Sequence, residues 1–89
     1  MLRVIFDGAE VVKVIVVNAK TYDGVTTYDV HCTEGRADEF PAWEVFHEGR
    51  LVIEGLASGR VDAHATFRGR ALSRGYHGPW YHFIVNATP

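Results

Sequence analysis

The chain has 89 residues, of which 47% are hydrophobic, 22% charged and 12% aromatic, and its formal net charge is −2. This length predicts a single domain, residues 1–89, and excludes a large multi-domain enzyme. The hydrophobic content excludes a disordered chain, because enough apolar surface is available to offset the entropy lost on folding. We therefore expect an ordinary soluble globule.

The residue types favour strands over helices. Val, Ile and Thr together number 22, whereas the good helix formers Leu, Lys, Met and Gln together number seven. β-Branched side chains fit a pleated strand and lose rotamer freedom in a helix. The composition therefore predicts a β-rich fold.

The first expected hairpin joins residues 2–6 to residues 11–17. Asp7-Gly8 between them is a tight-turn signal. The run 11–17 is apolar on both faces apart from Lys13, which predicts a central strand covered on both sides. Seven residues are far fewer than the roughly 20 that a membrane-spanning helix needs, so we expect no membrane span. Residues 1–7 reach Asp7 before an apolar signal region develops, and we interpret them as a first strand.

Asp23-Gly24 marks a second turn, and residues 25–33 alternate after it. This alternation predicts a strand with one buried and one solvent-facing side. The two expected faces are Thr26, Tyr28, Val30 and Cys32 on one side, and Thr27, Asp29, His31 and Thr33 on the other.

Residues 38–49 fit two interpretations. In the first, residues 43–46 and 51–54 form a hairpin whose turn is residues 47–50, with Gly49 as the turn glycine. In the second, Asp38 caps one helix near 38–48, with Pro41 in its first turn and Gly49 at its end. We favour the hairpin, because the strand at 51–53 needs a neighbour.

The rest of the chain reads as a loop at 55–59, a strand at 61–70, a Gly-bearing loop at 71–79 and a last strand at 80–86. The total is about seven short strands. The predicted fold class is all-β, a small antiparallel sandwich or barrel. The alternative is an α+β fold with one helix near 38–48 packed on an antiparallel sheet.

No catalytic or metal motif rises above background. The loop serine Ser58 lacks the spacing of a nucleophile elbow. Cys32 and His31 are adjacent on a strand, so they point to opposite faces, and Cys32 is better explained as a core residue. The other candidates are carboxylates without a fixed partner and histidines without ligand spacing: Glu44, Glu48, Glu54, His64, His77 and His82. We predict no catalytic residue, no metal and no cofactor.

The charges are distributed unevenly along the chain. Residues 1–48 carry nine acidic and four basic side chains, whereas residues 49–89 carry two acidic side chains and five arginines. If the strands at 61–70 and 80–86 pair antiparallel, His64, Thr66, Arg68 and Arg70 lie on one exposed face with Trp80 and His82. Val61, Ala63, Ala65 and Phe67 then face the core with Tyr81, Phe83 and Val85. The candidate binding residues are Arg68, Arg70, Arg74, Tyr76, Trp80 and His82.

Arginine and aromatic side chains are enriched in protein interfaces, and they also bind single-stranded nucleic acid. The isoelectric point of about 6.2 is lower than that of typical nucleic-acid modules, and so favours a protein partner. Our expectation is a non-enzymatic interaction module, an adaptor, inhibitor or assembly component, that binds a protein or itself through an edge strand or the Arg/aromatic face. The alternative is single-stranded nucleic-acid binding through that face. With a single cysteine, Cys32, no intrachain disulfide can form, and we expect a cytoplasmic location.

Overall fold

The computed structural model describes residues 2–32, 43–69, 72–73 and 79–86, and this part of the chain is built from strands joined by short turns. No helix occurs in it, so the predicted all-β antiparallel class is confirmed. The strands are β1 (Arg3–Phe6), β2 (Ala9–Val11), β3 (Val14–Tyr22), β4 (Val25–Cys32), β5 (His47–Glu54), β6 (Val61–Phe67), β7 (Leu72–Ser73) and β8 (Pro79–Asn86).

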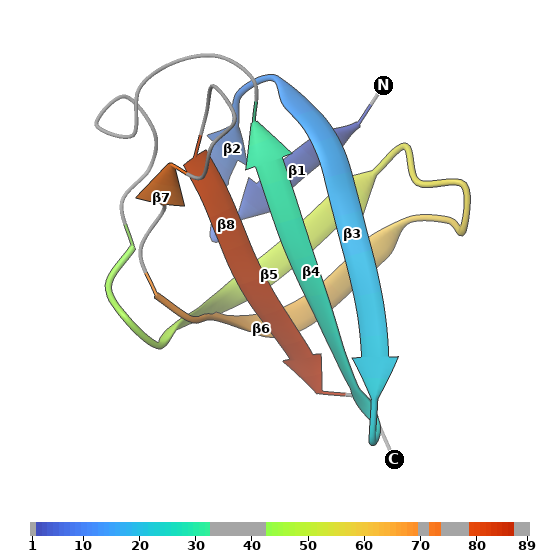
Figure 1. The fold of residues 1–89 in the computed structure, drawn as a ribbon, viewed down its shortest axis with the longest axis vertical. Coiled ribbons are helices and arrows are strands. Elements are labelled where there is room, and N and C mark those ends of the chain that lie inside the picture. The colour runs from blue at the N-terminus through green and yellow to red at the C-terminus, as the bar shows by residue number, and fades with distance from the viewer. Residues whose placement is uncertain (1, 33–42, 70–71, 74–78, 87–89) are drawn as a thin grey trace.

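All the strands belong to one antiparallel sheet that folds over into two layers. Its order is β2-β1-β5-β6-β8-β4-β3, with the short β7 added to β8. Strands β8, β4 and β3 form one layer, which crosses in front of the layer of β1, β5 and β6 (Figure 1). The ends of the strand order are β2 and β3, so each of these two strands has a free edge among the described strands.

The core between the layers is rich in aromatic rings. Phe6 of β1 packs 4.9 Å from Phe83 of β8 and 5.0 Å from Trp43, measured between ring centroids. Trp43 also lies 5.1 Å from Phe67 and 5.3 Å from Tyr81. Tilted and edge-on ring pairs of this kind add to the stabilisation that burial gives. Aromatic residues from both layers thus hold the folded sheet together.

Both Asp-Gly turns occur where the sequence predicts them. Phe6 pairs with Ala9 around Asp7-Gly8, and Tyr22 pairs with Val25 around Asp23-Gly24. Both central residues of each turn have positive φ, 51° and 83° in the first and 51° and 76° in the second. This is the type I′ geometry that matches strand twist and that Asp-Gly favours.

The predicted central strand at 11–17 is wrong in two ways. The run is split between β2 and β3 at Lys13, whose φ is 53°, and a register shift follows between Val14 and Val16. Both pieces are edge strands. The run is apolar because the chain crosses here from one layer to the other, so that Val11, Val14 and Val17 meet the core from two directions.

The hairpin favoured for residues 43–54 is also wrong. Residues 44–47 form a turn closed by a hydrogen bond from the His47 amide to the Glu44 carbonyl, and β5 runs straight through the predicted turn at 47–50. The neighbours of β5 are β1 and β6. Residues 43–48 are not helical either, and residues 38–42 of the alternative helix lie outside the described part. Gly49 is needed for close packing, because a Cβ there would lie 2.8 Å from Asp7 Cβ.

Most of the prediction for the strands at 61–70 and 80–86 is confirmed. β6 and β8 pair antiparallel at Thr66↔Ile84 and Phe67↔Phe83. The predicted inward set is on the core side, with Ala65, Phe67, Tyr81 and Phe83 buried. Two details differ: β6 ends at Phe67 rather than at 70, and the predicted loop at 71–79 contains β7. Residues 70–71 and 74–78 lie outside the described part.

Candidate interaction surface

The outer face of the β8-β4-β3 layer carries aligned side chains from three strands. Register pairs Val16 with His31 and His31 with Trp80, which makes one row across the sheet. The next rows are Asn18, Asp29 and His82, then Lys20, Thr27 and Ile84. We call these three rows the front face.

The row nearest the start of β3 is an aromatic stack. The rings of His31 and Trp80 lie 4.4 Å apart at an interplanar angle of 6°. His31 is only 2% exposed, although it lies on the side of β4 opposite Cys32. The alternation itself is correct, because His31 and Cys32 do point to opposite sides, but the neighbouring Trp80 covers the imidazole.

The second row contains a charged hydrogen bond. His82 Nδ1 and Asp29 Oδ1 are 2.6 Å apart, and both side chains are about one-third exposed. The contact fixes a carboxylate in the middle of the front face. A phosphate group arriving at His82 would meet this negative charge, whereas a lysine would be attracted to it.

The structure describes three of the six candidate binding residues. Trp80 and His82 lie on the front face, and the Arg68 amide donates to the His82 carbonyl at 3.1 Å. The Arg68 guanidinium lies 5.9 Å from the centre of the exposed Phe46 ring, within the range of a cation–π interaction. Arg70, Arg74 and Tyr76 lie outside the described residues.

The edge of the front face is β3, a nine-residue strand. Among the described strands it pairs with β4 alone. Its large apolar side chains are exposed, 86% for Tyr22, 46% for Ile15 and 39% for Val16. The unpaired N–H and C=O groups of a long edge strand are a template for pairing with another chain.

The turn at Asp23-Gly24 determines which backbone groups of β3 point outward. In a two-residue hairpin, the flanking pair Tyr22 and Val25 exchanges hydrogen bonds, and every second residue does the same. Lys20 and Asn18 therefore bond toward β4. The N–H and C=O groups of Val17, Ala19 and Thr21 point away from β4 at the edge.

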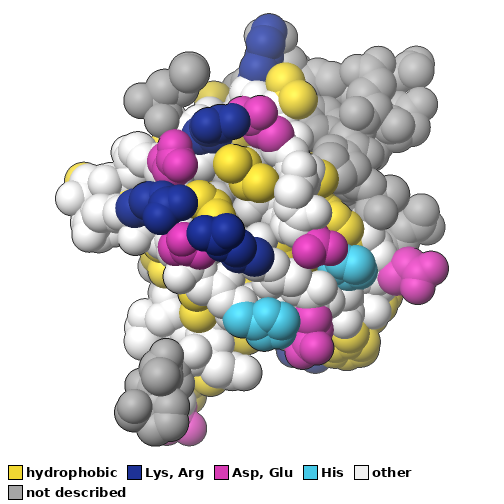
Figure 2. Space-filling view, turned by 180° about the vertical axis from the view of Figure 1, so that it is seen from behind, with side chains coloured by type: hydrophobic (Ala, Val, Ile, Leu, Met, Phe, Trp, Pro, Cys, Tyr) yellow, Lys and Arg dark blue, Asp and Glu magenta, His cyan; other side chains and the backbone are white. Residues whose placement is uncertain are grey.

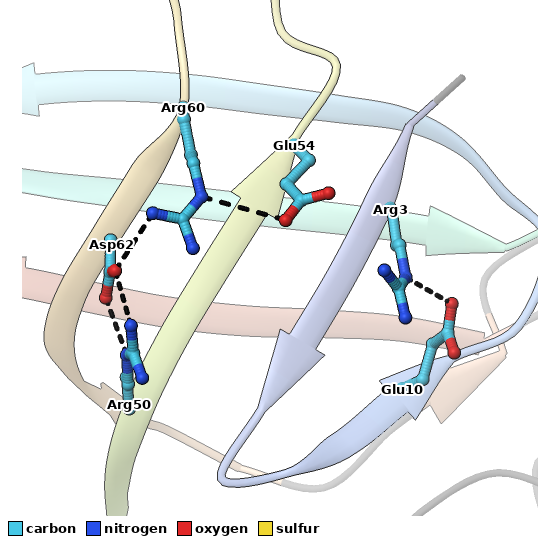
Figure 3. Close-up of polar contacts among 6 residues, drawn as sticks. All are labelled: Arg3, Glu10, Arg50, Glu54, Arg60 and Asp62. Carbon is cyan, nitrogen blue, oxygen red and sulfur yellow. Dashed lines mark hydrogen bonds and ion pairs between the residues drawn. The ribbon is translucent and has the colours of Figure 1, made fainter.

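The opposite outer face, on β2, β1, β5 and β6, carries alternating charges with a few hydrophobic side chains between them (Figure 2). Arg50 donates to both oxygens of Asp62, at 2.7 and 2.6 Å, and Arg60 lies 3.1 Å from the same carboxylate (Figure 3). The Arg50 hydrogen bond is the main reason why the pKa of Asp62 is lowered. Two of the five C-terminal arginines are thus already paired with carboxylates.

Two further ion pairs that involve arginine lie on this charged face. Arg60 Nε also lies 3.7 Å from Glu54, and Arg3 donates to Glu10 at 2.8 Å (Figure 3). Exposed pairs of this kind contribute little to stability, but they neutralise each other. The face therefore offers neither a free basic patch nor a free acidic patch over these residues.

The catalytic and metal candidates do not converge in the described part of the chain. Cys32 is buried, and burial raises its pKa to about 12, which makes it a poor nucleophile. His64 lies 3.9 Å from Glu48 on an exposed surface, and Ser58 is in an exposed turn. No three His, Cys, Asp or Glu side chains there are placed to hold a metal ion. His77 lies outside these residues.

The β3 edge was not predicted from the sequence. The error follows from taking residues 11–17 as central, because a central strand has no free edge. A signal was present in Asn18-Ala19-Lys20-Thr21, which is polar and weakly hydrophobic just before the Asp-Gly turn. Such residues are typical of a strand with little core to cover.

Comparisons of the chain with protein-family models, curated proteins and solved structures gave no match in any of the three. None of the described segments is a helix with the length and hydrophobicity needed to cross a bilayer.

Proposed function

We propose that this chain is a non-enzymatic interaction module that binds a protein by strand addition at β3. The observation that carries the proposal is the nine-residue edge, which pairs with β4 alone among the described strands. Outward N–H and C=O groups at Val17, Ala19 and Thr21 supply the backbone hydrogen bonds of such a complex. Exposed side chains along the strand supply the apolar contact.

The front face supports the proposal by extending the edge into a broader surface. Val16 is continuous with the His31–Trp80 stack, and Asn18 is continuous with Asp29 and His82. An added strand would therefore lie beside ordered rows of side chains. A reducing compartment such as the cytoplasm suits a module whose single thiol is Cys32.

Nucleic-acid binding through the Arg/aromatic face has less support. Trp80 already stacks on His31, which occupies one side of its ring, and His82 is held by a carboxylate. Arg50 and Arg60 are paired with Asp62. Stacking on bases and contact with phosphates would require these groups to exchange partners.

The experiment is photo-crosslinking in cells of the native host with a benzophenone side chain at position 22, on β3. The matched control carries the same group at Glu10 on β2, the short edge at the other end of the sheet. A third version combines the position-22 probe with Ala19→Pro. Proline at position 19 removes an outward N–H without removing a bond to β4, and edge strands tolerate proline there.

We expect a protein adduct at position 22, no adduct at position 10, and loss of the position-22 adduct with Ala19→Pro. Circular dichroism of the Ala19→Pro chain is the control that tests whether the sheet remains folded. Equal labelling at the two edges, or an adduct to nucleic acid in place of protein, would rule out the proposal.

A further inference from the structure

We infer that the strand added at β3 is β3 of a second copy of this chain, in an antiparallel pair with Ala19 on the two-fold axis. The inference rests on the proposed function and specifies the partner. It would join two three-stranded layers into one continuous sheet, in the order β8-β4-β3 followed by β3-β4-β8 of the second copy. Such an interface uses the same surface on both chains, as a two-fold dimer requires.

The backbone permits only some registers. Hydrogen-bonded pairs must join residues whose N–H and C=O groups both point outward, which are Val17, Ala19 and Thr21. With Ala19 opposite Ala19, Val17 lies opposite Thr21 on both sides of the axis. All three outward-facing residues of each chain are then paired, with about six hydrogen bonds between the copies.

Side chains on the outer face favour the same register. Tyr22 of each copy lies opposite Val16 of the other, and Asn18 lies opposite Lys20. These are the non-hydrogen-bonded positions, where side chains approach each other most closely. Tyr22, the most exposed large hydrophobic residue of the described chain, thus gains an apolar neighbour that is itself exposed in the single copy.

The neighbouring registers are poorer for identifiable reasons. With Asn18 on the axis, Lys20 lies against Val16, and Tyr22 falls opposite the irregular start of β3, where the register shifts and Val14 turns to the core. With Lys20 on the axis, two ammonium groups face each other, which is destabilising. Of these three registers, only the one centred on Ala19 gives Tyr22 an apolar neighbour and keeps the two lysines apart.

Charge adds a further complementarity. In the Ala19 register, Lys20 extends the second row of the other copy, beyond Asn18 and toward Asp29. Asp29 holds His82 with one oxygen, and its side chain is still 36% exposed. Each dimer would place two lysines in the same rows as two carboxylates, one strand away from them, so the arrangement is attractive on both sides of the axis.

Disulfide trapping tests the register. Residues 18 and 20 face each other across the axis only between copies, so a chain with Asn18→Cys is mixed with a chain with Lys20→Cys under mild oxidation. We expect the mixed covalent dimer to form about tenfold faster than either homodimer, because only directly opposed Cβ atoms meet disulfide geometry. A Glu10→Cys chain on the other edge controls for random collision, and wild-type chain controls for Cys32.

Sedimentation equilibrium of the purified 89-residue chain measures the association itself. We expect a concentration-dependent dimer, weakened about tenfold or more by Ala19→Pro, which removes the two central hydrogen bonds. A chain that stays monomeric at about 1 mM, the weak end of specific association, overturns the inference. So does a disulfide dimer that forms best between two Asn18→Cys chains, which would indicate a different register.

The cellular crosslink separates this inference from the proposed function. A position-22 adduct to a different protein, with a monomeric chain in sedimentation, leaves strand addition standing and overturns self-pairing. Absence of any protein adduct at position 22, together with a monomeric chain, overturns both.

Discussion

Two hairpins of this chain, β1–β2 and β3–β4, share the same Asp-Gly turn but differ in how much of the core they contribute. The β1–β2 hairpin contributes Val4, Phe6 and Val11 to the core, and its turn is fixed to β5 by a hydrogen bond from the Asp7 amide to the Arg50 carbonyl. The β3–β4 hairpin buries side chains mainly at the end of β4, and its turn projects beyond the opposite layer (Figure 1).

This contrast shows how little a turn determines. A type I′ turn sets which residues pair, but not what the hairpin packs against. The first hairpin ends in a three-residue edge, which is too short to recruit another chain easily, whereas the second ends in a nine-residue edge. We therefore expect the first hairpin to govern stability and the second to govern association.

The largest expected difference in the free energy of unfolding is between an alanine variant at Phe6 and one at Tyr22. Phe6→Ala should lower the free energy of unfolding by about 3–5 kcal/mol, because it opens a cavity among packed aromatic rings. Tyr22→Ala should change it by less than about 0.5 kcal/mol, as is usual for an exposed side chain. Urea unfolding of the two variants measures both values, and comparable losses would contradict the assignment of roles.

The contact of the first turn with β5 is tested at Gly49. Gly49→Ala places a Cβ 2.8 Å from Asp7 Cβ and 3.0 Å from its Cγ, and should cost about 1–3 kcal/mol through overpacking. Combining it with Asp7→Gly should recover much of this loss, since glycine keeps the positive φ of the turn. Additive losses in thermal unfolding of the double variant would show that the turn does not press on β5.

Two buried groups, Cys32 at the end of β4 and Tyr81 on β8, should make the free energy of unfolding fall at alkaline pH. Burial raises the pKa of Cys32 to about 12 and also raises that of Tyr81. As the pH rises, the unfolded chain therefore loses these protons before the folded chain does. These two groups leave the free energy of unfolding unchanged below about pH 9 and lower it above that pH. The slope should approach about 1.4 kcal/mol per pH unit for each group, the free energy of one pKa unit.

Urea unfolding at pH 8 and pH 11 measures this slope. Cys32→Ala should flatten it while lowering stability at both pH values, and Tyr81→Phe is the parallel variant on β8. An unchanged slope in both variants would show that neither group is responsible.

The smallest effect is expected on the charged face beside the first hairpin. Arg50→Gln should raise the pKa of the Asp62 carboxyl toward its ordinary value, because it removes the hydrogen bond that chiefly lowers it. NMR titration of the Asp62 carboxyl group measures this change in pKa directly. Arg60→Gln is the matched control and should shift the pKa less, so a larger shift there would reverse the roles of the two arginines.

Local signals in the sequence predicted several parts of the structure correctly. The Asp-Gly turns, the alternation of residues 61–67 and the inward set around Tyr81 and Phe83 follow from rules that act over a few residues. The candidate surface was predicted less well. Trp80 and His82 do lie on an outer face, but their partners His31 and Asp29 are about fifty residues away, and no local pattern joins them.

The strand-forming segments, the two turns and most of the core follow from local sequence patterns, because side-chain alternation and positive-φ residues act over a few residues. Tertiary structure decided that residues 11–17 divide between opposite edges and that residues 47–50 continue a strand. It also decided that β3 is an edge. A run of apolar residues indicates how much surface a segment buries, but the pairing of distant strands decides from which side that surface is covered.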